Sequence, residues 1–305
     1  MKSLLPLLLG LVILVLVAFS ANERATVFNF QTPKDAYEST YKVYALSLPD
    51  SMSFAGENVP LQKPDVRERM DRELLVNTYW QSNMMLMLKR ANKYFPTITA
   101  ILNEEGVPED FKYLAVIESG LQQVRSYKGA TGFWQIMRTT GREMGLEVNA
   151  NVDERYHVEK ATRAACKYLK RTYKKFGSWT LAAASYNRGV AGISRNLRSQ
   201  KVDNYYDLYL GEETRRYIFR ILAVKEIMKY PKKYGFVFAP KDLYEATEIK
   251  TVGLDTAITN IARFAQQMGV KYKELKLENP WLRQNHLNNE SRKYYEIKIP
   301  TTAGD

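Results

Sequence analysis

The sequence is poor in the residues that form disulfides and transition-metal sites. Its 305 residues include one cysteine, Cys166, and only two histidines, His157 and His286. A single cysteine excludes an intramolecular disulfide, and so few soft donors argue against a transition-metal site. Cys166 lies in a helical pattern, and we interpret it as a small core residue and not as a reactive thiol.

Acidic residues are in deficit as well. There are 33 Asp and Glu against 45 Lys and Arg, which gives a net charge of +12 and a pI near 9.5. This balance favours a polyanionic partner: nucleic acid, an anionic membrane face or an acidic wall polymer. A solvated basic surface without a specific partner is the alternative, since charge alone does not distinguish the two. A hydrophobic content of 45% excludes a disordered chain.

The N-terminus contains the only long apolar run. Lys2 precedes the run at 4–19, which has the pattern of a signal peptide with cleavage after Ser20. The run is slightly short for a membrane-spanning helix of about 20 residues, and an uncleaved anchor is the alternative. No cysteine near its end is available for lipid modification. We therefore expect an exported protein of the periplasm or cell envelope, which argues against nucleic acid as partner.

Strand-like alternation is scarce between residues 65 and 230, and we expect this region to be almost entirely α-helical. Pro96 and Pro108 should interrupt it. Gly145, Gly177 and Gly189 occupy positions typical of C-terminal helix caps. The predicted helices are 65–95, 109–118, 134–144, 158–176, 179–186 and 212–229.

The tail has a different pattern. Segments 246–252 and 294–299 are strand-like, and two helical segments, 256–268 and 271–278, lie between them. The order strand, helix, helix, strand predicts a small separate βααβ module after a linker near 231–240. The predicted domains are the leader or anchor 1–20, a helical extension 21–90, a helical domain 91–235 and the module 245–300.

Glu118 ends the predicted helix 109–118, whose faces are apolar all round. Phe111, Leu114 and Ala115 share its face at helical spacing. Burial and the negative end of the helix dipole would both raise the carboxyl pKa, as a general acid requires. The alternative is a surface glutamate that happens to end a helix. A negative charge there is unfavourable by about a few tenths of a kcal/mol, so structure alone gives no reason for it.

Two further segments have polar ends that packing does not explain. Segment 129–137 runs from glycines into Trp134 and Gln135, where a ring could stack on a sugar and an amide could bond it. Alternatively, Trp134 is a core residue that starts the next helix. Segment 182–189 has an alanine face suited to close helix packing, but it ends in Tyr186 and Asn187.

A fourth segment carries Glu213 and Tyr217, which are four residues apart on one helix face and can reach one site together. Alternatively, with Arg215 and Arg216 they form an ordinary charged surface turn. Taken in order, the four segments resemble the lytic transglycosylase family, the soluble-type catalytic domain of family 23 glycoside hydrolases, and within it the membrane-bound murein transglycosylases of the D group. The resemblance covers residues 65–230 and, more loosely, the tail.

The resemblance implies a fold and a site. The fold would be mainly α, a lysozyme-like all-helical catalytic domain with a small C-terminal βααβ module. Glu118 would be the sole catalytic acid and then base, and Ser126 would help to hold the substrate N-acetyl group. The remaining substrate-binding residues would be Gln135, Met137, Tyr186, Asn187, Glu213 and Tyr217.

One departure from the family pattern concerns Ser126. It follows the glutamate by eight residues where the family usually has nine, and Gln122-Gln123-Val124 replaces the common Asn-Pro-x-Ala pattern. We therefore expect the loop before Ser126 to have a different shape from that of the family.

The implied reaction is cleavage of the β-1,4 bond between N-acetylmuramic acid and N-acetylglucosamine in peptidoglycan glycan strands. No second carboxylate is evident beside Glu118, so the 2-acetamido group would stabilise C1. Glu118 would then deprotonate the C6 hydroxyl, giving a 1,6-anhydro ring without water, metal or organic cofactor. A goose-type lysozyme-like hydrolase, a non-catalytic wall-binding protein and a binder of anionic membranes are the alternatives.

The tail resembles a degenerate LysM module. Gly253, Asp255 and Thr256 match its start, and Ile299-Pro300 its end. The stretch 281–293 is unusually long and lacks the usual glycine before the last strand. The module would either bind glycan or serve as a spacer or packing module.

Overall fold

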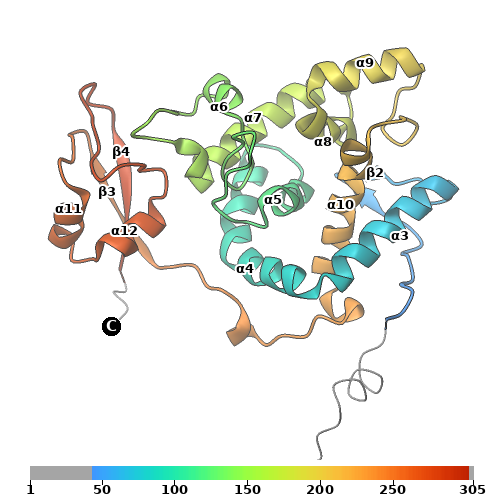
Figure 1. The fold of residues 1–305 in the computed structure, drawn as a ribbon, viewed down its shortest axis with the longest axis horizontal. Coiled ribbons are helices and arrows are strands. Elements are labelled where there is room, and N and C mark those ends of the chain that lie inside the picture. The colour runs from blue at the N-terminus through green and yellow to red at the C-terminus, as the bar shows by residue number, and fades with distance from the viewer. Residues whose placement is uncertain (1–42, 302–305) are drawn as a thin grey trace, which may run out of the picture. The chain divides into compact units, whose positions relative to one another are not determined.

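The computed structural model describes residues 43–301, and all the elements discussed below lie in the compact unit Leu46–Asp305 (Figure 1). The predicted signal peptide or anchor at 1–20 lies outside the described residues. Within the described part of the chain, no helix combines the length and the apolar character needed to cross a membrane.

The described part of the chain begins with a short hairpin of β1 (Ser53–Phe54) and β2 (Glu57–Asn58), followed by α3 (Pro64–Tyr79) and α4 (Gln81–Glu104). The single helix predicted at 65–95 is therefore wrong, as is the interruption at Pro96, which lies inside α4. Ile98, Ile101 and Leu102 are buried beyond it. Their burial outweighs the hydrogen bond that proline cannot donate.

The central helices follow the predicted pattern closely. Those at 158–176 and 212–229 are confirmed, whereas the segment 109–118 begins as a 3-10 turn. The sequence pattern did not predict α9, in which a glycine and polar residues dilute the apolar spacing. These elements are η1 (Glu109–Phe111), α5 (Lys112–Ser119), α6 (Arg138–Glu143), η2 (Glu154–Tyr156), α7 (Val158–Phe176), α8 (Trp179–Arg188), α9 (Val190–Gln200), α10 (Glu212–Lys229), η3 (Pro231–Tyr234) and η4 (Pro240–Asp242).

Helix α5 lies at the centre of this helical domain, with α4 and α10 packed against it (Figure 1). The side chains of Leu114 and Ala115 are fully buried, as is that of Phe111, which ends η1 directly before α5. Phe111 also contacts the ring of Phe54 edge-on, at 5.1 Å between ring centroids, and that of Trp179 at 5.5 Å. The short helix is thus held by tertiary packing, which fixes the position of its C-terminal end.

The tail folds as the predicted βααβ module. Strand β3 (Ile249–Leu254) pairs antiparallel with β4 (Tyr295–Pro300), and α11 (Ile261–Gln267) and α12 (Tyr272–Glu278) lie between them in the chain. Helix α11 starts later than predicted, because the Asn260 side chain accepts a hydrogen bond from the Arg263 N–H and caps the helix there. Ile261, Leu275 and Ile297 form part of the module core.

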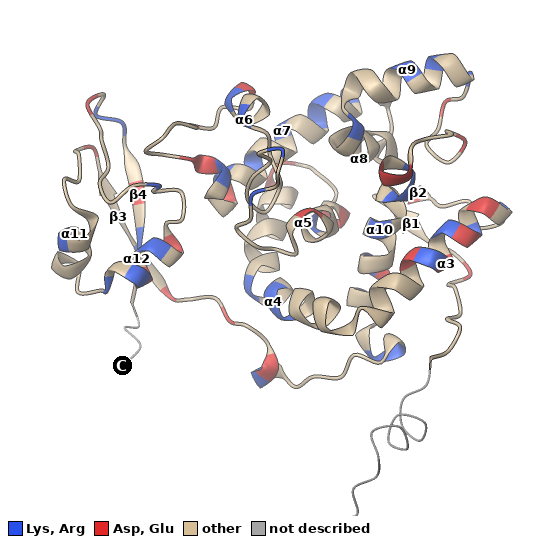
Figure 2. Ribbon diagram, viewed as in Figure 1, with Lys and Arg blue, Asp and Glu red and all other residues tan. Residues whose placement is uncertain are grey.

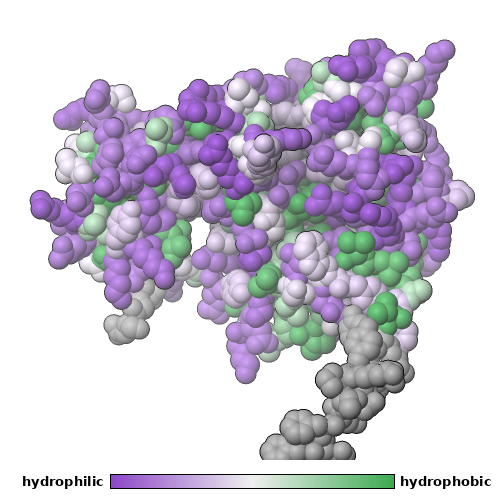
Figure 3. Space-filling model, in the orientation of Figure 1, coloured by the Kyte–Doolittle hydropathy of each residue, from purple (hydrophilic) through white to green (hydrophobic). Residues whose placement is uncertain are grey.

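Charged residues of both signs are interspersed on elements such as α3, whereas α9 carries only basic ones (Figure 2). In the view of Figure 3, hydrophilic residues cover most of the face, including that of the C-terminal module. The excess of positive charge is therefore spread over several elements.

Candidate active site

Glu118 lies in the last turn of α5. The helix ends at Gly120, whose φ of 59° is left-handed and whose N–H donates to the Val116 carbonyl at 2.7 Å. Most of α5 is buried, but Glu118 and Ile117 are only partly so. The carboxyl therefore stands at the edge of the core, reachable by a substrate and largely shielded from bulk water.

Helix α10 supplies the partners of this carboxyl. The hydroxyl of Tyr217, a residue only 2% exposed, donates a hydrogen bond to Oε1 of Glu118. One turn later, Nη2 of Arg220 donates to the Ile117 carbonyl at 3.0 Å. Both contacts hold the end of α5 against α10 and orient Glu118.

The pKa of the Glu118 carboxyl is raised above its ordinary value. Burial is the largest cause, and the negative charge of Glu213 adds to it. The hydrogen bond from Tyr217 and the positive charge of Arg220 offset only part of this effect. A protonated carboxyl at the edge of a core can donate its proton to a bound substrate.

The two tyrosines around Glu118 remain hydrogen-bond donors. Burial, followed by the charge of Glu118, raises the pKa of Tyr217 and of Tyr186 well above the ordinary value. Tyr186, near the end of α8, donates its hydroxyl to the Trp134 carbonyl at 2.7 Å. Tyr217 therefore presents a proton to Glu118, and Tyr186 ties α8 to the segment that carries Gln135.

Residues 131–136 form a tight turn, where the sequence had suggested the start of a helix. Thr131 and Ile136 exchange backbone hydrogen bonds of 3.1 Å, and Gly132 and Gln135 have positive φ angles of 78° and 45°. The predicted helix start at 134 is therefore wrong, and α6 begins at Arg138. The sequence does not predict the positive φ at Gln135, because positive φ angles are expected mainly at glycine.

The turn buries Trp134 and leaves Gln135 partly exposed. The Trp134 ring has no exposed surface and donates Nε1–H to Oγ1 of Thr162 at 2.9 Å, so it is a core residue and not a platform for a sugar. The Gln135 amide donates to the carbonyls of Gly132 at 2.9 Å and Val124 at 3.1 Å. Its oxygen is left to accept from a ligand.

The end of α8 and the start of α10 come together as the sequence suggested. Asn187 donates from Nδ2 to Oε1 of Glu213 at 3.1 Å, and its Oδ1 accepts from the Thr214 hydroxyl at 2.8 Å. Glu213 is exposed. This pair is thus positioned beside Tyr217, one helical turn further along α10.

Ser126 and Met137 take no part in these contacts. The Ser126 hydroxyl accepts a hydrogen bond from the Ala130 N–H at 3.0 Å, within the same exposed loop. Met137 is 42% exposed at the N-cap of α6.

Two residues that the sequence did not single out for a role also shape the site. Ser119, next to Glu118, donates its hydroxyl to the Phe133 carbonyl at 2.9 Å and so ties α5 to the turn. Arg220 acts through the Ile117 carbonyl. Arg220 lies three residues after Tyr217, and this spacing in the sequence could have shown that both side chains lie on the same face of the helix.

Among residues 43–301, no group of three or more metal-binding side chains is present.

Two segments of the chain match known protein families. Residues 96–208 match the family model of the Transglycosylase SLT domain, and residues 250–303 match the soluble lytic transglycosylase C-terminal LysM-like domain. The chain therefore carries an SLT-type transglycosylase domain, of lysozyme-like helical fold, followed by a LysM-like domain.

A particular relative is the membrane-bound lytic murein transglycosylase D of Escherichia coli, from strains K12 and O6:H1. The chain is 27% identical to each over 265 residues, which is 84% of this chain and 57% of the relative, so it spans little more than half their length. A solved structure of an inactive mutant of the lytic transglycosylase Slt from Pseudomonas aeruginosa is 22% identical. That match covers 50% of this chain and 26% of the other, with a TM-score of 0.37.

Proposed function

We propose that the chain is a peptidoglycan lytic transglycosylase. It would cleave the β-1,4 bond between N-acetylmuramic acid and N-acetylglucosamine and leave a 1,6-anhydro-N-acetylmuramic acid end. The observation that carries this proposal is the carboxyl of Glu118, which has a raised pKa, is bonded by the buried Tyr217 hydroxyl and lies within an SLT domain.

In the first step, protonated Glu118 donates its proton to the glycosidic oxygen. The bond from C1 to that oxygen breaks, and N-acetylglucosamine leaves with the proton. Positive charge develops at C1 of the muramoyl residue, where the oxygen of its own 2-acetamido group stabilises it. The substrate thus takes the part of a second carboxylate.

In the second step, Glu118 acts as a base. Its carboxylate takes the proton of the muramoyl C6 hydroxyl, whose oxygen bonds to C1 and displaces the acetamido oxygen. The proton is back on Glu118, no water is consumed, and every group used belongs to the chain or the substrate. The Tyr217 hydroxyl and the charge of Arg220 favour the carboxylate between the steps, against burial.

The remaining predicted residues would bind the sugar. Gln135 offers an amide oxygen, and Tyr186 and Asn187 end a helix near Glu118 and Glu213. Glu213 would contact the saccharide near the scissile bond rather than act as nucleophile, because it is exposed and accepts from Asn187. In the same proposal, Ser126 would help to hold the substrate N-acetyl group and Met137 would line a sugar subsite.

We also propose that the protein is exported and that it has the domain boundaries predicted from the sequence. The apolar N-terminal run would act as signal peptide or membrane anchor, and the protein would work in the periplasm or cell envelope. The relatives' description as membrane-bound supports this location. The divisions near 20, 90, 235 and 245 remain predictions. Helix α4 runs continuously across residue 90.

Digestion of purified peptidoglycan in water enriched in heavy oxygen tests the reaction type. We expect muropeptides that are lighter than hydrolysis products by one water and carry no heavy label. Label at a new reducing end would instead identify a hydrolase of the goose-lysozyme type. Intact substrate with well-folded protein would indicate a wall-binding protein.

A further inference from the structure

The long stretch 281–293 between α12 and β4 contacts the helical domain. Trp281 and Leu282 are buried, and they share one apolar cluster with Val152 and Tyr156 of that domain. The Asp153 N–H donates to the Trp281 carbonyl at 2.9 Å, beside an isolated bridge between Val152 and Leu282. The stretch that departs from the LysM pattern is therefore a docking segment.

Asn151 forms much of the polar part of this contact. Its side chain donates to the His286 carbonyl at 2.9 Å and accepts from the Asn288 N–H at 2.8 Å. Its own carbonyl accepts from the Arg283 N–H at 2.9 Å. Three hydrogen bonds to module backbone groups fix the register of the docking segment.

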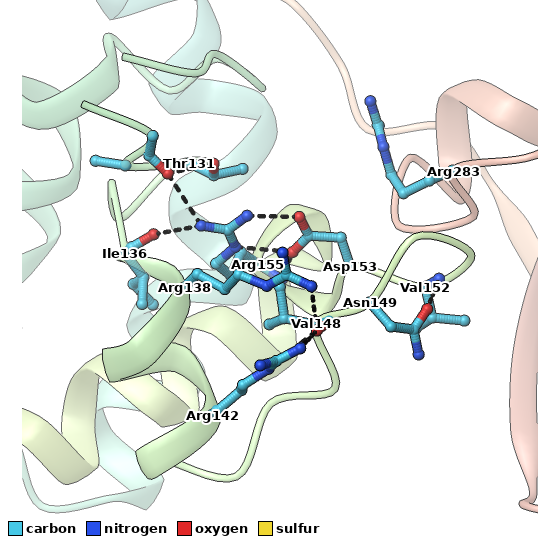
Figure 4. A network of polar contacts seen from close by, with 12 residues as sticks. Thr131, Ile136, Arg138, Arg142, Val148, Asn149, Val152, Asp153, Arg155 and Arg283 are labelled. Atoms are coloured by element: carbon cyan, nitrogen blue, oxygen red, sulfur yellow. Dashed lines mark hydrogen bonds and ion pairs between the residues drawn. The ribbon is translucent and has the colours of Figure 1, made fainter. Parts of the chain in front are cut away.

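Charged groups surround the same contact. Lys293 donates to Glu147 at 2.6 Å and lies 3.4 Å from Glu154, which is 3% exposed. The Tyr295 hydroxyl donates to Glu147 at 2.9 Å. Arg283 lies over the ring of Tyr156, 4.1 Å from its centroid, and points toward the helical domain in Figure 4.

Arg155 connects this docked segment to the active-site turn. Its guanidinium is held by both oxygens of Asp153, at 2.9 and 2.7 Å. It also donates to the carbonyl of Gly129, before the turn, at 3.0 Å. A second bond of 3.1 Å, to the carbonyl of Ile136 at the end of the turn, is drawn in Figure 4. Arg155 is 6% exposed, so these bonds are shielded from competing water.

The backbone of Arg155 lies against the turn too. A Cβ added at Gly132 would be 2.1 Å from the Arg155 carbonyl oxygen. The turn carries Gln135 and the Trp134 carbonyl that accepts from Tyr186. A shift of the Asp153–Arg155 segment must therefore move the turn and, with it, side chains proposed to bind sugar.

We infer that the C-terminal module is an intramolecular positioning element for the turn 131–136, acting through Asp153 and Arg155. Arg155 is a positioning residue: its bonds set where Gln135 stands, and the module sets where Arg155 stands. The kinetic consequence rests on the proposed function, whereas the structural coupling does not.

Two docking variants of the full chain, Asn151→Ala and Arg283→Ala, test the coupling. The matched control is Arg263→Ala, which removes the same charge as Arg283→Ala from an exposed site on α11. Amide hydrogen exchange of the segment 129–136 should be at least about fivefold faster in both docking variants than in the control. On soluble glycan strands, KM should rise by a similar factor while kcat stays within about twofold.

Substitutions at Arg155 test the link itself. Arg155→Met should give the faster exchange without touching the module, and Arg155→Lys should restore part of the protection because it keeps the charge beside Asp153. Near-UV circular dichroism checks that each variant is folded. Equal exchange in the docking variants and the control overturns the inference. An inactive wild type would refute the proposed function alone, since the exchange comparison would still decide the coupling.

Discussion

At the scale of single residues, the account depends on Glu118 and the tyrosine that contacts it. The hydroxyl of Tyr217 bonds the carboxylate and lowers a pKa that burial has raised. Tyr217→Phe should therefore raise the pKa further and move the alkaline limb of the pH–rate profile to higher pH, since the acid must be protonated.

The loss of orientation in Tyr217→Phe should also lower the maximal rate by about tenfold. Tyr209→Phe, at a side chain 80% exposed, is the control and should leave the profile unchanged. An alkaline limb at its wild-type position in Tyr217→Phe would mean that the hydroxyl does not tune Glu118.

The raised pKa of Glu118 also predicts a pH-dependent stability. The neutral carboxyl is favoured in the folded state, so its contribution is complete at low pH and is lost as pH rises through the raised pKa. Glu118→Gln should thus gain stability over wild type with rising pH. Thermal melts across the pH range measure this. Glu290→Gln, at an exposed carboxylate, should show no such trend, and a flat difference for Glu118→Gln would contradict the assignment.

The sequence predicts those site residues that have a recognisable spacing within one helix. Glu118 was found because an ionisable group ended an apolar helix, and Tyr217 because it lies one turn from Glu213. Arg155 and Asn151 were missed. Their partners are mainly backbone carbonyls and amides distant in the chain, which no local pattern encodes.

At the scale of elements, the turn 131–136 is the most constrained. An alanine at Gly132 would have a strained positive φ of 78°, and its Cβ would clash with the Arg155 carbonyl. An alanine at Gly177 would have a similar φ of 67°, but no atom would lie near its Cβ. Gly177→Ala should cost about 1 kcal/mol of unfolding free energy. Gly132→Ala should cost at least about 2 kcal/mol more and reduce activity.

Denaturant unfolding of both glycine variants measures these costs. Equal losses of unfolding free energy in the two variants would show that the turn can move away from Arg155. The close contact between Gly132 and the Arg155 carbonyl would then not be needed for function.

Helices with a clear apolar stripe were predicted well, as α7 and α10 demonstrate. Two of the errors occurred where tertiary packing overrides local preference: Pro96 inside α4, and the turn that replaces the start of a helix at Trp134. In both places, burial of neighbouring side chains decides the backbone, and burial is a property of the fold rather than of the local sequence.

At the scale of the whole molecule, the core of the module extends to two residues of the helical domain. Val152 and Tyr156 pack in one cluster with Trp281 and Leu282. The helical domain and the module should therefore unfold in a single cooperative transition in calorimetry. Two separated transitions would show that the docking contact is weak. The βααβ order was predictable from the sequence, but the docking was not, because it joins segments over a hundred residues apart.

The most direct test of the central claim compares wild type with Glu118→Gln on purified peptidoglycan, with 1,6-anhydro-muropeptides quantified by mass spectrometry at equal protein concentration. The account predicts anhydro ends as the main wild-type product and at least about 100-fold less from the folded variant. Anhydro product formed by Glu118→Gln at the wild-type rate would contradict the account, as would wild-type products with only reducing ends.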